Sequence, residues 1–379
     1  MSMTRVDHSV VRKLAQWNPD GIPITSFYLT VDGRLYPRKS DYEVRLDNLL
    51  RRGRAQAEGE GLSKDALRSV LGDLEAIGRF VREEFERGDT RGLALFSAKA
   101  AGLWEEVRLP RPVRDRATVA SAADVLPLEQ VLETYRPMCL ALVDYEKARV
   151  FLSELGRIEE VTDVIDDVPG RHDQGGWSQM RMQRHVDDHR LRHLRRVADA
   201  LFQLLKTNPF DSLVLAGPAE ARLDLERNLH PYLRERVRAG LTLAMTATLD
   251  EVAARCLELE EEQERTKEAA KVEALRAAAD SGGKAVTGLP GTLAAVAEGR
   301  VAEIMVTLDL SAPGFSCPSC GRLTERGTRC PACGSTMEPV ADVVEEAVAR
   351  AVRQGCRVET IVHPDGLAAY GGIGALLRF

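Results

Sequence analysis

The sequence predicts a mixed α/β protein of three domains. Segments rich in β-branched and aromatic residues alternate with amphipathic segments along most of the chain, which is typical of α/β architecture. A length of 379 residues exceeds what one hydrophobic core usually holds. A cluster of four cysteines near the C-terminus predicts a small metal-bound insert within the last domain.

The first domain is expected over residues 1–130. It should contain strands at 22–31, 91–98 and 103–109 and helices at 41–56 and 63–87. Ser63 suits the N-cap of the second helix. Two short basic runs, at 37–39 and 51–54, could contact RNA, although ordinary basic surface is the simpler interpretation.

The second domain is expected over residues 131–280. The pattern predicts strands at 138–144, 149–155, 157–164 and 211–216, a long helix from about 180 to 206, and a highly charged helix from about 249 to 279. Ser281-Gly282-Gly283 marks the boundary with the third domain, residues 281–379. That domain should contain helices at 291–299 and 340–354 and strands at 301–309 and 357–363.

The overall charge argues against a protein that coats nucleic acid. The formal net charge is -6, yet residues 171–196 hold seven arginines, three acids and four of the seven histidines. A basic island on an acidic chain favours a local phosphate-rich partner, with a solvated helix face as the alternative. The chain has neither an apolar run of membrane-spanning length nor a signal-like N-terminus, so we expect a cytoplasmic protein without a membrane partner.

The cysteine pattern is the most specific chemical signal. Cys317, Cys320, Cys330 and Cys333 form two CPxC turns within a predicted ribbon over residues 315–338. Two such turns supply a tetrahedral set of four thiolates and leave no position for water, so we predict structural rather than catalytic zinc. An iron–sulfur site is the alternative. Cys139, Cys256 and Cys356 stand alone in apolar or helical surroundings and should be small core residues.

The long helix at 180–206 has two unlike halves. Its C-terminal half carries one apolar stripe, whereas its N-terminal half is surrounded by charge. The stripe consists of Leu191, Leu194, Val197, Ala198, Leu201, Leu204 and Leu205. The helix should therefore pack on its domain only at its far end and present its near end, with Gly175 and Gly176 before it, to solvent or a partner. A mobile surface loop is the alternative interpretation.

The stretch GGWSQMRMQRHVDDHRLRHLRRVADAL resembles the central-domain loop and helix of the archaeal and eukaryotic class-1 peptide release factors. SGGKAVTGL before the last domain, the position of the cysteine ribbon and the closing GGIGALLRF are similar to that family as well. Together these segments span the last two-thirds of the chain. The nearest form is the bacterial branch of the superfamily, whose loop is Gly-Gly-Trp-Ser-Gln.

The resemblance implies a central RNase H-like α/β domain. It also implies a C-terminal α/β/α sandwich of the kink-turn RNA-binding ribosomal protein type. In the family the loop enters the peptidyl-transferase centre and places the water that attacks peptidyl-tRNA. By position, Gly175 and Gly176 match the two glycines, Ser178 the serine, and Arg181 and Arg184 the arginines.

Trp177 occupies the position of the family's glutamine, and the stop-codon motifs of the first domain are missing. An indole can stack on an RNA base but supplies no amide, whereas Gln179 could replace the glutamine if the loop changes register. Two functions follow. One is rescue of stalled ribosomes by peptidyl-tRNA ester hydrolysis, with Gly175, Gly176 and Gln179 as catalytic residues and Trp177, Ser178, Arg181 and Arg184 as RNA contacts. The other is a non-catalytic dormancy factor in the ribosomal A site. The expected partners are ribosomal RNA, peptidyl-tRNA and a translational GTPase, but not DNA.

Overall fold

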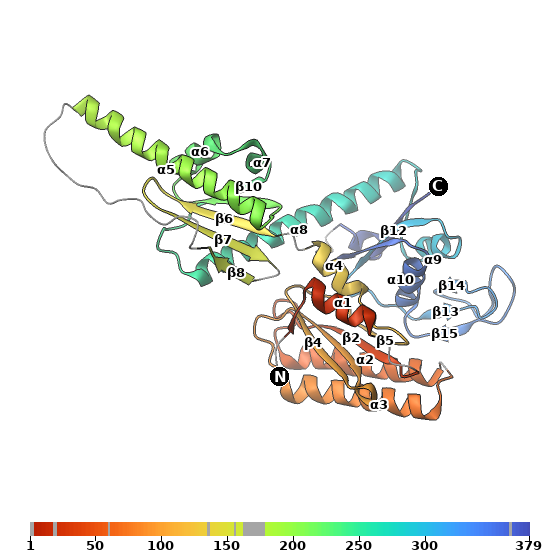
Figure 1. Cartoon of the computed structure of the whole chain (residues 1–379). Helices are drawn as coiled ribbons and strands as arrows, with labels where there is room; N and C mark the ends of the chain where they lie inside the picture. The colour runs from red at the N-terminus through yellow and green to blue at the C-terminus, as the bar shows by residue number, and fades with distance from the viewer. Residues whose placement is uncertain are drawn as a thin grey trace. The chain divides into compact units, whose positions relative to one another are not determined.

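The computed structural model describes residues 4–17, 21–59, 61–134, 137–154, 157–161, 179–363 and 366–379 (Figure 1). The fold is mixed α/β, as predicted. The chain divides into two compact units. Unit 1 combines residues 1–129 with residues 262–379, and unit 2 comprises Gln130–Glu261. None of the helices in the described part of the chain has the length and apolar composition needed to cross a membrane.

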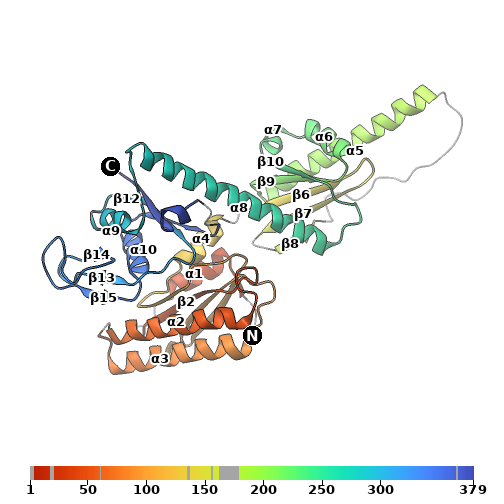
Figure 2. The same cartoon turned by 180° about the vertical axis from the view of Figure 1, so that it is seen from behind.

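The N-terminal part of unit 1 is a five-stranded sheet in the order β1-β4-β3-β2-β5. These strands are Thr4–Arg5, Leu103–Leu109, Gly92–Ala98, Ile24–Thr30 and Arg116–Ala120. Helices α2 (Lys39–Gly59) and α3 (Lys64–Arg79) cover one face, where Phe27, Leu29 and Leu46 are fully buried. Helix α1 (His8–Gln16) lies on the opposite side of the sheet (Figures 1 and 2). The sequence patterns predicted β2, β3 and β4 but not α1 or β5.

Helix α3 begins where the sequence predicts and ends earlier than expected. The Ser63 hydroxyl caps it by accepting a hydrogen bond from the backbone N–H of Ala66 at 3.2 Å. The predicted end near residue 87 was wrong. From Phe80 to Glu84 the chain forms a π-helical turn, and Phe85 leaves in an extended conformation. This wider turn lets the side chains of Phe80 and Phe85 enter the same core.

The C-terminal part of unit 1 has three layers. Its sheet runs in the order β11-β17-β12-β16, with strands Ala285–Thr287, Ile373–Leu377, Val301–Thr307 and Arg357–Ile361. Helices α9 (Leu289–Ala297) and α10 (Val343–Arg353) cover one face. On the other face, Val272 and Leu275 of α8 (Leu249–Asp280) pack against Met305 and Ile361. A smaller sheet, β14-β13-β15, is inserted between β12 and α10, with strands Leu323–Thr324, Gly314–Ser316 and Glu338–Val340.

Unit 2 is built on a five-stranded sheet in the order β10-β9-β6-β7-β8. The strands are Val237–Leu241, Ser212–Ala216, Met138–Val143, Ala148–Glu154 and Arg157–Glu160. Helix α4 (Leu126–Thr134) leads into it. One face packs against α5 (Gln179–Thr207), α6 (Ala219–Asn228) and α7 (Pro231–Arg234). The opposite face packs against Val252 and Cys256 at the start of α8.

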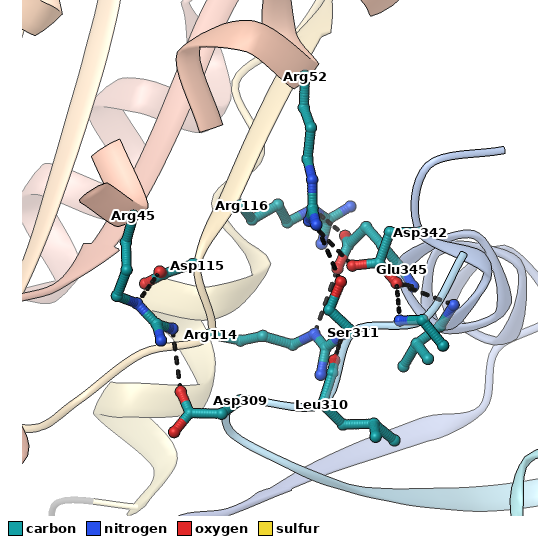
Figure 3. A network of polar contacts seen from close by, with 12 residues as sticks. Arg45, Arg52, Arg114, Asp115, Arg116, Asp309, Leu310, Ser311, Asp342 and Glu345 are labelled. Atoms are coloured by element: carbon teal, nitrogen blue, oxygen red, sulfur yellow. Dashed lines mark hydrogen bonds and ion pairs between the residues drawn. The ribbon is translucent and has the colours of Figure 1, made fainter. Parts of the chain in front are cut away.

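Four arginines join the two parts of unit 1 (Figure 3). Arg114 precedes β5, and its guanidinium donates to the carbonyl oxygens of Thr307 at 3.2 Å and Leu310 at 2.7 Å. The same group pairs with the Glu345 carboxylate of α10 at 3.3 Å, and Arg116 reaches that carboxylate at 2.9 Å. Both arginine side chains are largely buried, with 11% and 16% exposed. Several cationic hydrogen bonds therefore converge on the loop after β12 and on the start of α10.

The other two arginines come from α2 and extend the network. Arg45 bridges Asp115 of its own part and Asp309 after β12, with N–O distances of 2.5 and 3.0 Å. Arg52 donates to the Asp342 carboxylate at 3.0 Å and to the Ser311 hydroxyl at 2.9 Å. Since Asp342 also caps α10, Arg52 contacts the residue that fixes the start of that helix.

Burial raises the pKa of the Asp115 and Asp124 carboxyls, while their arginine partners, Arg45 and Arg116, act in the opposite direction. A raised native pKa means that the folded state binds protons more readily than the unfolded state. The contribution of these carboxyls to stability is therefore complete at low pH and declines as pH rises through their native pKa values. The arginines limit that decline by stabilising the charged forms.

We expect Arg114→Ala to lower the free energy of unfolding of unit 1 by about 3 kcal/mol. This is the lower end of the range of about 3–5 kcal/mol for removing one partner of a buried pair, because the substitution removes the donor to the Leu310 carbonyl while Arg116 still pairs with the Glu345 carboxylate. Urea unfolding monitored by circular dichroism would measure the change.

Arg68→Ala is the matched control, because Arg68 and its partner Asp65 are almost fully exposed. It should change stability by less than about 1 kcal/mol. Equal effects of the two substitutions would contradict a stabilising role for the network.

Candidate functional site

The four predicted cysteines converge in the small sheet of unit 1. Cys317 and Cys320 lie in the turn between β13 and β14, and Cys330 and Cys333 lie in the turn before β15. The sulfur atoms of all four lie within 4.8 Å of one another. The Cys317–Cys333 and Cys320–Cys330 sulfur pairs are each 3.4 Å apart, and the Cys320–Cys333 pair is 3.6 Å apart. Four sulfurs at such separations can hold a single metal ion.

The two cysteine turns have the same backbone construction. Gly321 donates its N–H to the Cys317 carbonyl at 2.7 Å, and Gly334 donates to the Cys330 carbonyl at 2.9 Å. Their φ angles are +72° and +74°, in the left-handed region that favours glycine. This backbone conformation explains why a glycine follows the second cysteine of each turn. In addition, the Arg350 guanidinium of α10 donates to the Gly321 carbonyl.

The environment of the cluster suits a structural ion. Cys317 and Cys330 are buried against Met337 and Phe315, whereas Cys320 and Cys333 are exposed. The hydroxyl and backbone N–H of Ser335 lower the pKa of the Cys333 thiol to about 6, which favours the thiolate that a metal requires. The cluster can bind a metal ion through four protein ligands. The three isolated cysteines are buried, as predicted.

The C-terminal half of helix α5 packs against the rest of its unit, as predicted. Leu194, Val197, Leu201 and Leu204 are buried in the core of unit 2. Toward the N-terminus, Asp188 and Arg190 are exposed. The first turns of α5 extend past the sheet and the neighbouring helices of its unit (Figure 1). The helix is thus fixed at its C-terminal half.

The turn between β6 and β7 supports the middle of α5. The Arg190 guanidinium lies over the Tyr145 ring, with its carbon 4.5 Å from the ring centroid. The Tyr145 hydroxyl in turn donates to the Asp224 carboxylate of α6 at 3.0 Å. This chain of contacts links α5 to α6 through one aromatic ring. The sequence patterns did not reveal it, because the three residues are far apart in the chain.

His193, one of the four histidines of the basic island at residues 171–196, does not contribute positive charge to it. Its side chain is buried, with 2% exposed. Burial lowers the pKa of its imidazole, so the ring is neutral at neutral pH and helps to pack α5. The positive charge along α5 therefore comes from its arginines.

The remaining predicted site residues fall around the start of α5. Gln179 begins the helix, and positions 181 and 184 follow within its first two turns. Residues three apart on a helix lie on one side of it, so these two arginine positions are neighbours. Gly175, Gly176, Trp177 and Ser178 lie outside the described residues.

Arg52 and Arg54 of the basic run at 51–54 have acidic neighbours within unit 1. Arg52 is bound to Asp342 and Ser311 within the network of Figure 3. Arg54 lies 3.9 Å from Glu75 of α3. This run therefore contributes to the internal structure of unit 1.

Comparison with known proteins places the central part of the chain in a family. Residues 124–261 match the model of bacterial archaeo-eukaryotic release factor family 10. This part of the chain is therefore similar to the bacterial branch of the archaeo-eukaryotic release factors. The matched range contains the diglycine, the whole of α5 and the sheet of unit 2.

Curated relatives extend the similarity of this release-factor-like chain beyond the matched range. Peptide chain release factor subunit 1 of Thermococcus onnurineus is 26% identical over 357 residues, which cover 84% of this chain and 86% of that protein. Among solved structures, Archaeoglobus fulgidus Pelota is 15% identical, with a TM-score of 0.38 and coverage of 76% and 79%. A ribosome-bound archaeal Pelota, described together with ABCE1, is 13% identical, with a TM-score of 0.41 and coverage of 100% and 95%.

We expect the purified protein to contain one metal ion per chain and Cys317→Ser or Cys333→Ser to lose it. An insert this small depends on its metal to fold, so metal loss should expose the ribbon to proteolysis while unit 2 stays folded. Elemental analysis and limited proteolysis would measure both effects.

Cys356→Ser provides the control, because the Cys356 thiol is buried outside the cluster and donates to the Val301 carbonyl at 3.1 Å. This variant should keep its metal. A metal-free wild-type protein with a protease-resistant ribbon would rule the site out.

Proposed function

We propose that this release-factor-like protein binds the ribosomal A site and rescues stalled ribosomes by hydrolysing the ester of peptidyl-tRNA without reading a stop codon. The observation that carries the proposal is the release factor family match over residues 124–261, because it contains both the diglycine and the arginine-bearing start of α5. Thermococcus onnurineus peptide chain release factor subunit 1, similar over most of its length, supports the same assignment.

The construction of α5 supports a role in reaching a distant target. Its apolar C-terminal half is held in the core of unit 2, and Tyr145 supports its middle. The N-terminal turns of α5, which the diglycine precedes in the sequence, are then at the free end of a long helix. Arg181 and Arg184 would contact ribosomal RNA phosphates there, with Trp177 and Ser178 on nearby bases.

The chemistry requires little from the protein beyond positioning. In the proposed reaction a water oxygen attacks the ester carbonyl of peptidyl-tRNA, the acyl–oxygen bond breaks, and the leaving ribose oxygen of the tRNA takes a proton from the water and becomes a hydroxyl. Gly175 and Gly176 would allow the backbone to approach the ester closely, and Gln179 would orient the water. Backbone and amide groups would stabilise the charge that develops on the carbonyl oxygen.

A non-catalytic function is the second candidate, and Trp177 favours it. An indole at the family's glutamine position cannot orient water through an amide, although it can stack on RNA. The protein would then occupy the A site of idle ribosomes as a dormancy factor. In either role the partners are ribosomal RNA and peptidyl-tRNA, with a translational GTPase as a candidate for delivery.

We also propose that the metal is structural zinc. A closed set of four cysteine ligands matches zinc ribbons, and no ligand position remains for a substrate. We further propose the three domains that the sequence predicts. The central domain would have the RNase H-like fold, and the C-terminal domain would have the fold of the kink-turn RNA-binding ribosomal proteins. The five-stranded sheet of unit 2 and the three-layered C-terminal part support it.

The rescue function predicts that purified protein releases peptide from stalled ribosome complexes and that Gly176→Ala and Gln179→Ala lose this activity. We expect a loss of about 100-fold or more, the size seen when one group that stabilises a developing oxyanion is removed. Release of labelled peptide measured over time would test it.

Matched controls are Gly72→Ala, where an added methyl group has open space, and Gln203→Ala on the exposed part of α5. Both should retain full activity. Ribosome binding without release by the wild-type protein would reject hydrolysis and leave the dormancy function.

The arginine positions predict a salt effect. We expect Arg181→Ala combined with Arg184→Ala to weaken ribosome binding. The slope of log K against log salt should become shallower by about 1–2, because binding with fewer phosphate contacts releases fewer counterions. Cosedimentation with ribosomes at several salt concentrations would measure the slope.

The control, Arg54→Ala combined with Arg68→Ala, removes the same charge from exposed positions of unit 1. It should leave the slope unchanged. Identical slopes for wild type and the α5 variant would exclude phosphate contacts at these arginines.

A further inference from the structure

Unit 2 carries a row of three aromatic rings at the C-terminal end of α5. The ring of Phe202 stacks on that of His230, with centroids 4.1 Å apart and an interplanar angle of 19°. The His230 ring is followed by Tyr232, with centroids 5.1 Å apart and an angle of 38°. Phe202 is half-buried, His230 is exposed, and Tyr232 is 60% exposed. The row therefore runs from the core of the unit to solvent.

The backbone under the last two rings is firmly held. His230 caps the short α7, where its ring nitrogen accepts a hydrogen bond from the Tyr232 N–H at 3.3 Å, and Leu233 is fully buried beneath. Arg234 donates to the carbonyls of Glu226, Arg227 and Leu229 at the end of α6. Arg236 donates to the Tyr232 carbonyl at 2.6 Å. A ring mounted in this way loses little conformational entropy when a ligand binds.

Basic side chains occur on both segments that carry the row. The Lys206 ammonium lies 4.3 Å from the centroid of the Phe202 ring, and residues 201–210 contain no acid. Residues 229–241 contain three arginines and one glutamate. Figure 2 shows α7 beside α5 on the same face of the sheet. Lys206 and the arginines of residues 229–241 are thus cations on the two segments that carry the exposed ring.

We propose that Tyr232 is a stacking platform for an unpaired RNA base, which would become the fourth ring of the row. Lys206 and the exposed Arg238 would then attract the adjacent phosphates. Exposed rings combined with flexible cations are typical of single-strand binding surfaces. The proposed ribosome binding supplies the source of the RNA, but the platform can be tested without ribosomes.

The test measures binding of a short fluorescein-labelled oligoadenylate to the full chain by fluorescence anisotropy. Tyr232→Ala and Tyr232→Leu should weaken binding by about 5-fold to 100-fold, the usual effect of losing one base–aromatic stack. Tyr232→Phe and Tyr232→Trp should bind as tightly as wild type or more tightly. The comparison is repeated in a protein that also carries Arg181→Ala and Arg184→Ala. RNA binding by these two arginines of α5 then cannot mask the loss of binding at Tyr232.

Val44→Ala is the control, because Val44 is exposed to a similar degree, 63%, on α2. Its affinity should equal that of wild type, and thermal melting should show that all variants fold. Equal affinities for the wild-type protein and the Tyr232→Leu variant would overturn the platform. So would a loss of ribosome binding in Tyr232→Ala with unchanged oligoadenylate binding, since that result indicates a protein contact. Tyr232-dependent oligoadenylate binding by a protein that ignores ribosomes would support the platform and refute the proposed function.

Discussion

The contact of Arg114 with the loop after β12 makes one unit out of two segments that are distant in sequence. The Arg114 guanidinium bonds to the carbonyls of Thr307 and Leu310, separated from it by 193 and 196 residues. Neither part needs this arginine to complete its own sheet, so the network determines their mutual arrangement rather than their separate folds. Because the loop after β12 also leads into the cysteine ribbon, the network fixes the segment from which the ribbon starts.

Sequence patterns predicted the elements whose signals are local. The apolar stripe of α5 and the two cysteine turns depend on spacing within a few residues, and the structure confirms both. Long-range pairings were not predictable. A run of arginines at 51–54 looks like basic surface until Asp342 is placed opposite Arg52. Strand β5 was missed because it is short, whereas helix α1 was missed although its nine residues are amphipathic and Asp7 caps it.

The same distinction applies to the candidate sites. The cysteine cluster could be predicted from spacing alone, since each pair of ligands lies in one turn. The row of Phe202, His230 and Tyr232 could not, because it joins α5 to the turn before α7. His193 shows the opposite error. His193 stands in a highly charged stretch, which suggested that it lies at the surface. The structure instead buries it next to Leu194 on the side of α5 that faces the core.

The distribution of charge is compatible with the RNA binding proposed for this acidic chain. In unit 1 the four network arginines are neutralised by carboxylates, so they add little to the external field. Along the described part of α5, by contrast, Arg190, Arg192 and Arg195 are exposed to solvent. Their field acts over roughly a Debye length of about 8 Å at physiological salt. A partner rich in phosphate would therefore be attracted to α5 and the surface beside it, while the acidic remainder would oppose binding elsewhere.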